Sequence, residues 1–533
     1  MIKNSISKIK SWMVNNKNEA LAISLILVAA SFLRLYKIDQ YMTFLGDEGR
    51  DVIIVRRLLV DFDIILVGPG TSIGNMYLGP IYYYMMAPAL LLANFSPVGP
   101  AVMIALLGVT TVFFVWFVAR EWFGKLAALV AALLYAIAPT ITTYSRSSWN
   151  PNIMPFFALL TIYSVWKVWK KLNYRWLIVT GVSMGFVLQS HYLGLLLVPV
   201  IGLFWLLTYL TIKNSKLEIK SLIKQSFIGL LLFSVLMSPL VIFDARHDWR
   251  NFAAMKDFFT QRQTTVSAKP WSGLEKLPEI ANETTGSLLG AKSENLTWLY
   301  IYGALYIFLW MSGEYFFSKK KINLADKTYW KYLYDKITSS YYAPFFILFT
   351  WLFFAHLGLT LYKQHIYDHY FGFFFPAPFL LVGGLTSYIY NNFGKVWKTI
   401  LAIFIMYALY VNLANNQLKY PPNRQLQRSE TVANFIVQQT GSEKFNLAVI
   451  AERNYEGAYQ YFLERWNAPI VIIDAQRADE TITNQLYVVC ELPSEKCDPT
   501  HNPKTEVANF GWSNIEGVWQ IEGTTVYKLI HSE

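Results

Sequence analysis

Stretches of about twenty apolar residues recur along most of the chain, and no other feature constrains its fold as strongly. A helix of that length crosses the hydrocarbon core of a bilayer, where a backbone must satisfy its own hydrogen bonds. Of the 533 residues, 54% are hydrophobic and only 15% are charged, whereas a soluble enzyme would need far more charge. The pattern predicts a polytopic α-helical membrane protein with about eleven transmembrane helices, near residues 19–37, 98–118, 125–143, 152–168, 176–190, 192–212, 222–242, 297–317, 343–361, 371–390 and 396–414.

The first apolar segment is expected to stay in the protein as a membrane anchor. Basic residues precede it, and Arg34-Leu35-Tyr36-Lys37 follows where a signal peptide would carry small residues for cleavage.

The distribution of lysine and arginine predicts the orientation, because these residues favour cytoplasmic loops. With the N-terminus inside, the predicted inner segments carry 22 of them in about 74 residues, and the outer loops carry 14 in about 139 residues. The inner segments include 318–337, and the longest outer loops are 38–97 and 243–296. An odd number of spans also places the tail after residue 415 outside. We therefore expect a multi-pass protein of the inner (cytoplasmic) membrane of a bacterium.

The net charge of +11 does not indicate nucleic-acid binding, because much of it lies in these predicted cytoplasmic loops. The bilayer and its headgroups are the expected partner of this charge.

The first outer loop, 38–97, is too long to serve only as a connector. It contains the run Gly46-Asp47-Glu48-Gly49-Arg50-Asp51 and an apolar stretch at 81–93 that is too short to span comfortably. We interpret 81–93 as an interfacial helix anchored by tyrosines. A twelfth span is the alternative, but it would reverse every later loop and contradict the charge distribution.

The paired carboxylates Asp47 and Glu48 are the main candidates for chemistry. Ionisable side chains near hydrocarbon are costly, so a pair beside a membrane helix is either simply hydrated or retained for function. The structural alternative for Asp47 is a solvated loop carboxylate or the N-cap of a short helix.

Other polar side chains gather at the predicted outer ends of the spans. Alone, each histidine among them is more often an interfacial or hydrogen-bonded residue than a catalyst, but together with cations and an acidic pair they suit an anionic ligand. The candidates for substrate or phosphate binding are Arg50, Arg146, Asn150, His191, Arg246, His247, Lys363 and His369. We expect Asp47, Asn150, His191 and His247 to surround one outward cavity.

The chain shows no nucleotide-binding motif: there is no phosphate-binding loop, no dinucleotide fingerprint and no His-Glu-x-x-His helix. The energy for a transfer reaction must therefore arrive with the substrate. A lipid-linked donor with a phosphate leaving group would supply it at an outer membrane edge.

The order of these features resembles the GT-C superfamily of membrane glycosyltransferases, especially the branch of protein O-mannosyltransferases and lipid A aminoarabinose transferases. The resemblance covers about residues 19–415 and rests on short motifs in a fixed order. They are Asp47-Glu48 in the first outer loop, Pro80-Ile-Tyr-Tyr-Tyr at an interfacial helix, Arg120-Glu-Trp-Phe123-Gly124 at a cytoplasmic turn, Pro139 followed by Tyr144-Ser-Arg146, and His369-Tyr370 before Pro376.

The sequence departs from this branch at two positions. Asn150 stands where relatives carry a second acidic residue, and Gly79-Pro80 replaces a pair of prolines and has no histidine before it. A divalent metal is therefore a possible cofactor only, and the metal ligands are unknown.

The resemblance implies that Asp47 is the general base of an inverting glycosyltransferase and that Glu48 orients the loop or the acceptor. The co-substrate would be a sugar linked to polyprenyl phosphate, and the acceptor a lipid, a glycan or a protein outside the membrane. The cations and histidines named above would neutralise the leaving phosphate.

The tail, 416–533, is long enough to form its own core. Its pattern predicts a small extracytoplasmic α/β domain with helices near 429–436 and 455–466 and strands near 446–450, 469–474, 486–490 and 525–530. Cys490 and Cys497 lie in this domain, where a disulfide or free thiols are more plausible than a metal site. The domain shows no catalytic cluster, so acceptor binding or structural support is the expected role.

Two other functions remain as alternatives. A transporter or flippase would use similar spans, but the sequence has no internal repeat and no paired broken helices. An O-antigen ligase or polymerase would also use lipid-linked sugars, but would be expected to lack an Asp-Glu pair directly after the first span.

Overall fold

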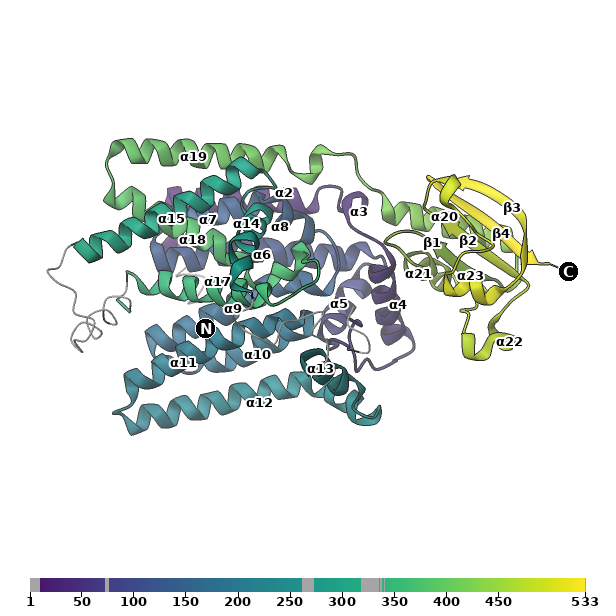
Figure 1. The fold of residues 1–533 in the computed structure, drawn as a ribbon, viewed down its shortest axis with the longest axis horizontal. Helices are drawn as coiled ribbons and strands as arrows, with labels where there is room; N and C mark the ends of the chain where they lie inside the picture. Colours follow the sequence, from purple (N-terminus) through teal and green to yellow (C-terminus); the bar gives the residue numbers. More distant parts are fainter. Residues whose placement is uncertain are drawn as a thin grey trace.

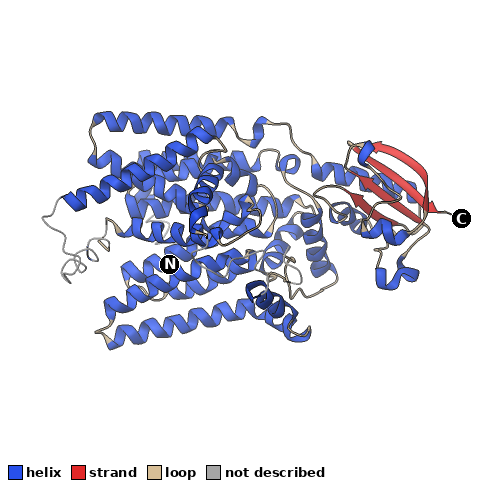
Figure 2. Ribbon diagram, viewed as in Figure 1, coloured by secondary structure: helices blue, strands red, loops and turns tan. Residues whose placement is uncertain are grey.

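The computed structural model describes residues 10–71, 76–260, 273–317, 335, 338–339 and 341–532. A long helical bundle forms most of the molecule, and a small domain that contains the β-sheet lies at one end of it (Figures 1 and 2). The predicted inner loop 318–337 and the middle of the outer loop 243–296 lie largely outside the described residues.

Each of the eleven predicted apolar segments forms a helix or a pair of consecutive helices. These are α2 (Lys17–Leu35), α6 (Val98–Phe123), α7 (Lys125–Ile137) with α8 (Pro139–Tyr144), η1 (Asn150–Ile153) with α9 (Met154–Lys171), α10 (Trp176–Ser190), η2 (Tyr192–Leu197) with α11 (Val198–Ile212), α12 (Lys216–Arg246), α15 (Glu294–Phe317), α17 (Ala343–Thr360), η4 (Asp368–Phe374) with α18 (Pro376–Asn392), and α19 (Lys395–Ala414).

The polytopic helical class is confirmed. Within the described residues, six helices are long and apolar enough to cross a membrane, or seven if η4 and α18, which bend by 59°, form one span. Shorter apolar helices such as α7 and α10 do not reach that length alone. The count of eleven spans stays a prediction.

Local sequence explains where several helices end. Gly124 separates α6 from α7 with φ of +91°, a conformation that side chains with a Cβ rarely adopt. Pro139 begins α8, because proline fits the first turn of a helix but not its interior. Arg120 at the end of α6 pairs with the buried Glu19 of α2 at 2.6 Å, which joins these two helices.

The first outer loop folds into three further helices: α3 (Ile38–Tyr41), α4 (Gly46–Val60) and α5 (Ile81–Leu92). The stretch 81–93 is thus helical as predicted, and its twelve residues pack against α4 and α6. Its interfacial position stays a prediction. The second long loop contains α13 (Arg250–Thr260), η3 (Leu274–Lys276) and α14 (Leu277–Leu288).

The C-terminal part forms the predicted α/β domain. Its sheet has the order β1-β2-β4-β3, with β1 and β2 parallel and the other pairs antiparallel. The strands are β1 (Asn446–Ile450), β2 (Gln485–Cys490), β3 (Ser513–Ile521) and β4 (Thr524–His531). The helical elements are η5 (Gln417–Lys419), α20 (Gln425–Thr440), α21 (Gly457–Arg465), η6 (Ala475–Arg477), α22 (Ala478–Thr481), η7 (Ser494–Lys496) and α23 (Thr505–Phe510).

One predicted strand is wrong and one strand was not predicted. The run 469–474 makes a single bridge, between Phe445 and Ile470. The Asn446 side chain donates a hydrogen bond to the next carbonyl, that of Val471, in place of a backbone amide, so the strand does not continue. The edge strand β3 is polar and largely exposed and contains a bulge at Ile515/Gly517, so it lacks the apolar alternation on which the prediction relied.

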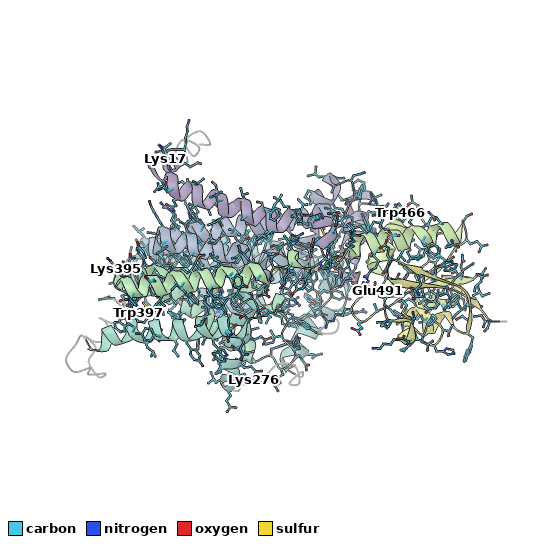
Figure 3. The ribbon with its side chains drawn as sticks, turned by 90° about the horizontal axis from the view of Figure 1, so that it is seen from above. Lys17, Lys276, Lys395, Trp397, Trp466 and Glu491 are labelled. Atoms are coloured by element: carbon cyan, nitrogen blue, oxygen red, sulfur yellow. A yellow bond between two sulfur atoms is a disulfide. The ribbon has the colours of Figure 1, made fainter. Side chains whose placement is uncertain are left out.

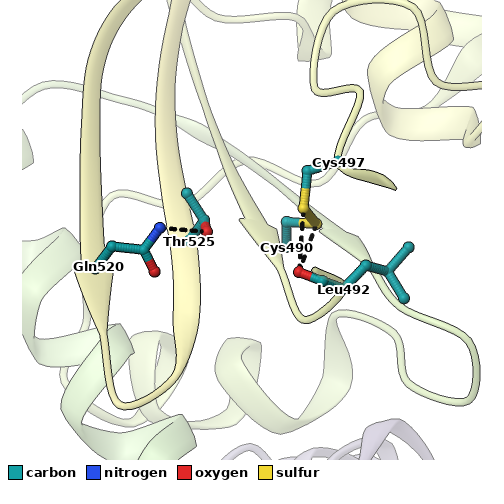
Figure 4. The surroundings of a disulfide bond; sticks show 5 residues. All are labelled: Cys490, Leu492, Cys497, Gln520 and Thr525. Atoms are coloured by element: carbon teal, nitrogen blue, oxygen red, sulfur yellow. Dashed lines mark hydrogen bonds between the residues drawn. A yellow bond between two sulfur atoms is a disulfide. The ribbon is translucent and has the colours of Figure 1, made fainter. Parts of the chain in front are cut away.

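The two cysteines of the chain form a disulfide between the end of β2 and the loop after η7 (Figure 4). The bond closes a short loop beside the sheet, and Cys490 is fully buried. The sequence had left a disulfide and free thiols open.

The C-terminal domain docks directly on α4. Gly49 of α4 and Gly457 of α21 approach so closely that a Cβ on Gly49 would collide with the backbone carbonyl group of Gly457. Phe44 packs against Tyr461 and Phe462 of α21, and Arg57 pairs with Glu464 at 2.8 Å. The first outer loop and the tail therefore share one hydrophobic core.

The bundle has a basic end far from this domain. In Figure 3, Lys17, Lys395 and Trp397 lie at the end of the bundle opposite to Trp466 and Glu491 of the C-terminal domain. Lys17 and Lys395 begin α2 and α19, respectively. Which of the two ends faces the cytoplasm stays a prediction.

We expect Gly49→Ala to separate the two parts of the molecule. The added methyl group meets backbone atoms, which cannot rotate away, so α4 and α21 must move apart at a cost of about 1–3 kcal/mol. Thermal unfolding of the purified protein in detergent should shift down by several degrees, and proteolytic release of the C-terminal domain should accelerate. Gly394→Ala is the matched control, because nothing lies within 4 Å of its Cβ position. Equal behaviour of the two variants would contradict this docking.

Candidate active site

The predicted acidic pair lies in the first turn of α4, a helix that begins at Gly46. The Leu45 amide donates to Glu48 Oε2 at 3.0 Å, so the buried Glu48 closes the helix start. The Gly46 amide donates to Asn454 Oδ1 of the C-terminal domain at 2.8 Å. The helix thus starts at a fixed point, and Asp47 projects from it with 43% of its side chain exposed.

Arg50 lies between two carboxylates of the same helix. Its Nη1 donates to Asp47 Oδ1 at 2.9 Å, and its Nε and Nη2 donate to Asp51 Oδ1 at 3.0 and 2.7 Å. Asp51 is fully buried. A buried carboxylate is retained only with a partner of opposite charge, so Asp51 fixes the guanidinium in place.

Two tyrosines from distant segments complete this network. Tyr83 of α5 donates to Asp51 Oδ1 at 2.9 Å, and Tyr455 of the C-terminal domain donates to Asp47 Oδ1 at 2.7 Å. Arg50 Nη1 also reaches the Tyr455 hydroxyl at 3.3 Å. Among the residues that the structure describes, none donates to Asp47 Oδ2, which leaves that oxygen open to a ligand.

Asp47 and Arg50 line a cavity of about 630 Å³, which we call the main cavity. Its volume is typical of a site for a small organic ligand. Most of its wall is apolar or aromatic, with residues from the first outer loop, η2, α13, α17 and η4. Within the described lining, Arg50 is the one lysine or arginine.

Five of the ten predicted site residues line the main cavity: Asp47, Arg50, Asn150, His191 and His369. Asp47, Asn150 and His191 thus surround one cavity as expected, whereas His247 does not line it. Asn150 Nδ2 donates to the Ser190 carbonyl at 2.7 Å, which ties the start of η1 to the end of α10. Their roles in binding stay predictions.

The other predicted cations lie away from this wall. Arg146 is fully buried and donates to the carbonyl oxygens of Leu33 and Tyr36, which are unsatisfied groups at the end of α2. Arg246 and Lys363 are exposed. His247 is also exposed, stacks on Phe243 and contacts the Phe243 carbonyl.

His191 does not supply a positive charge at neutral pH. Burial lowers its pKa to about 4, so the ring is neutral at pH 7. Its Nδ1 accepts a hydrogen bond from the Leu193 amide at 3.2 Å, so the ring also positions the start of η2.

Aromatic rings gather on one part of the wall, around His369. Its ring centroid lies 4.5 Å from that of Trp149, 4.6 Å from that of Tyr370 and 6.1 Å from that of His191. Tyr144 and Tyr367 also line the cavity here. Such rings offer flat surfaces on which a sugar ring can pack.

A second, smaller cavity of about 210 Å³ lies on another side of Asp47. We call it the side cavity. It shares Asp47, Tyr144 and Trp149 with the main cavity. Its remaining lining residues are Thr43, Leu45, Glu48, Thr143, Ser147, Asn152, Arg453 and Tyr455.

A metal would need converging side-chain ligands. In the described part of the chain, no group of three or more His, Cys, Asp or Glu residues is close enough to hold an ion.

Sequence reasoning missed Asp51, Tyr83 and Tyr455. Asp51 belongs to the same motif as Asp47 and follows it by four residues. On a helix this spacing places the two side chains on the same face, which was the available signal. Tyr455 lies 408 residues from Asp47 in the chain, so no local pattern pointed to it.

The family profile of dolichyl-phosphate-mannose-protein mannosyltransferases matches residues 78–243, about a third of the chain. The fold is similar to that of ArnT from Cupriavidus metallidurans bound to undecaprenyl phosphate, with a TM-score of 0.59 and 12% sequence identity over 96% of this chain and 97% of that one. No curated protein sequence matches the chain significantly.

Two further solved structures are similar at a lower level, with TM-scores of 0.48. One is ArnT from Cupriavidus metallidurans in the apo state, at 13% identity over 98% of both chains. The other is the oligosaccharyltransferase AglB from Archaeoglobus fulgidus, at 12% identity over 90% of this chain and 70% of that one. The family profile together with the fold of bound ArnT confirms the resemblance to the GT-C superfamily of membrane glycosyltransferases.

The buried Glu48 should make stability depend on pH. Burial raises its pKa from 4.5 to about 7, with smaller contributions from the charges of Asp47 and Asp51. Between these values the folded state holds a proton that the unfolded state has released, so Glu48 destabilises the fold progressively as the pH rises from about 4.5 to 7. Glu48→Gln keeps an acceptor for the Leu45 amide without this cost, which is on the order of 3 kcal/mol.

The thermal midpoint of Glu48→Gln minus that of the wild type should therefore increase by several degrees as the pH rises across this window. Below and above the window, this difference should not change with pH. Glu480→Gln, at an exposed position of α22, is the control and should show no such trend. A flat difference between Glu48→Gln and the wild type would refute the raised pKa.

Proposed function

We propose that the protein is an inverting glycosyltransferase that moves a sugar from a polyprenyl-phosphate donor to an acceptor on the outer face of the cytoplasmic membrane. One observation carries this proposal: the Asp47–Arg50 pair lies on the wall of a largely apolar cavity of about 630 Å³. Transfer from such a donor needs a base for the acceptor proton, a cation for the phosphate and an apolar wall for the polyprenyl chain.

Two likenesses support the same class. One is to a family of dolichyl-phosphate-mannose-protein mannosyltransferases, and the other is to a fold solved with undecaprenyl phosphate. Both names contain a polyprenyl phosphate, which is an anionic headgroup on an apolar chain. The main cavity offers apolar residues of η2 and α13 for the chain and Arg50 for the phosphate.

Arg50 retains a donor for this phosphate. A guanidinium has five N–H groups. The described contacts with Asp51, Asp47 and Tyr455 use four of them and leave one on Nη2. Charge-assisted hydrogen bonds of this kind stabilise negative charge on the leaving oxygen.

Asp47 is the proposed general base. The acceptor oxygen attacks the anomeric carbon from the face opposite to the phosphate, and the bond between that carbon and the phosphate oxygen breaks with its electron pair. The acceptor proton passes to Asp47 Oδ2, and polyprenyl phosphate leaves. Because the attack is direct, the anomeric configuration inverts. The aromatic wall around His369 would hold the sugar ring during this step.

Transfer by the wild type should collapse in Asp47→Asn. An amide cannot take the acceptor proton, so the rate should fall about 10²–10⁴-fold, while Tyr455 and Arg50 still donate to the remaining carbonyl oxygen and keep the site folded. The measurement is transfer of radiolabelled sugar from a panel of polyprenyl-phosphate sugars, in liposomes supplied with crude envelope acceptors.

Asp479→Asn, at an exposed position of α22, is the matched control and should transfer like the wild type. Absence of transfer with every donor, together with movement of a solute or lipid across the bilayer that does not need Asp47, would replace the proposal by a transporter.

A further inference from the structure

We propose that the side cavity is the acceptor site and that Arg453 of the C-terminal domain selects an acceptor sugar with a negatively charged group. This inference rests on the proposed function, because it assigns the second substrate of the same reaction. It gives the C-terminal domain a direct part in recognition.

The position of Asp47 is the first argument. A base that deprotonates the acceptor must touch the acceptor hydroxyl while the donor sugar lies within reach of that hydroxyl. Asp47, Tyr144 and Trp149 line both cavities, so the two spaces meet at the proposed base. The main cavity suits the long donor, which leaves the side cavity for the acceptor.

The size and lining of the side cavity indicate what it holds. At about 210 Å³ it is smaller than an ordinary ligand pocket and has room for one compact group of a larger acceptor. Its wall combines the rings of Tyr144, Trp149 and Tyr455 with the hydroxyls of Thr43 and Thr143. Rings beside hydroxyl groups suit a sugar better than a lipid chain.

Charge is the argument for an anionic sugar. Asp47 is already matched by Arg50, and Glu48 is buried with its Oε2 bonded to the Leu45 amide. Arg453 is exposed at the cavity, and its side chain forms no ion pair or hydrogen bond with any residue that the structure describes. A carboxylate or phosphate on the acceptor would supply its partner.

The C-terminal domain places Arg453 next in the chain to two residues that bind the start of α4. Arg453 precedes Asn454 and Tyr455, which bind the Gly46 amide and Asp47 respectively. Three consecutive residues of this domain therefore contact or face the start of α4. Recognition of the acceptor and orientation of the base are coupled through one short segment.

A binding experiment tests the site without requiring transfer. The two native cysteines are paired in a disulfide, so Thr143→Cys introduces one free thiol at the wall of the side cavity. Millimolar glucuronate or glucose 6-phosphate should slow its reaction with a thiol reagent at least fivefold, and glucose should protect it less. Adding Arg453→Gln should abolish the difference between the charged and neutral sugars.

The controls are Asp479→Cys, a thiol on the far exposed α22, and Arg477→Gln, an exposed arginine of the same domain that pairs with Asp474 outside both cavities. None of the sugars should slow the reaction of the Asp479→Cys thiol. Arg477→Gln should leave the protection of the Thr143→Cys thiol unchanged. Equal rates of thiol reaction with and without all three sugars, or protection that Arg453→Gln leaves unchanged, would overturn the proposal.

A transfer experiment separates this proposal from the general function. With a working donor, the wild type should use a glucuronide at least tenfold better than the matched neutral glucoside, and Arg453→Gln should reduce this ratio to near one through KM. Equal use of both acceptors by the wild type would overturn the assignment of Arg453 while the glycosyltransferase stands. Thiol protection without transfer from any donor would overturn the proposed reaction while the binding site stands.

Discussion

The candidate site depends on the ion pairs of one group, the guanidinium of Arg50. It is held by the fully buried Asp51 and in turn holds Asp47, so one side chain fixes both the charge and the geometry of the cavity wall. The buried carboxylate is costly by itself, and the pair is retained because each charge compensates the other. Removing Asp51 would take two hydrogen bonds from Arg50, whose guanidinium would then be held only through Nη1, by Asp47 and Tyr455.

Three separate parts of the chain converge on this contact. The α5 helix contributes Tyr83, which donates to Asp51, and the C-terminal domain contributes Tyr455, which donates to Asp47. The close approach of Gly49 and Gly457 makes the second contact possible, because any larger residue would separate α4 from α21. The docked domain is thus part of the wall of the side cavity, and its Tyr455 helps to orient the proposed base.

Periodic and local features of this fold could be predicted from the sequence, whereas contacts between distant segments could not. The eleven apolar segments are helical, and Asp47 and Arg50 share a cavity with Asn150, His191 and His369. Arg146 is the last residue of the Tyr144-Ser-Arg146 motif at a predicted outer loop, yet its guanidinium donates to carbonyl oxygens at the end of α2. Unsatisfied carbonyls at a helix end attract a nearby cation, and only the packing of α2 beside α8 reveals that they are near. Tyr455 and Arg453 required the docked tail to be seen.

The shared use of Arg50 has a consequence for the proposed chemistry. Within the described lining, this one guanidinium must serve both the base and the leaving phosphate. A donor phosphate that approaches Arg50 competes with Asp47 for the same positive charge, so the Asp47 carboxylate is least neutralised when the donor is bound. It is then best able to accept a proton from the acceptor. Without a donor, the Arg50 guanidinium and the Tyr455 hydroxyl both donate to Asp47 Oδ1. Binding of the lipid-linked sugar would thus prepare the base for the second substrate, which is an order of events that two independent cations would not impose.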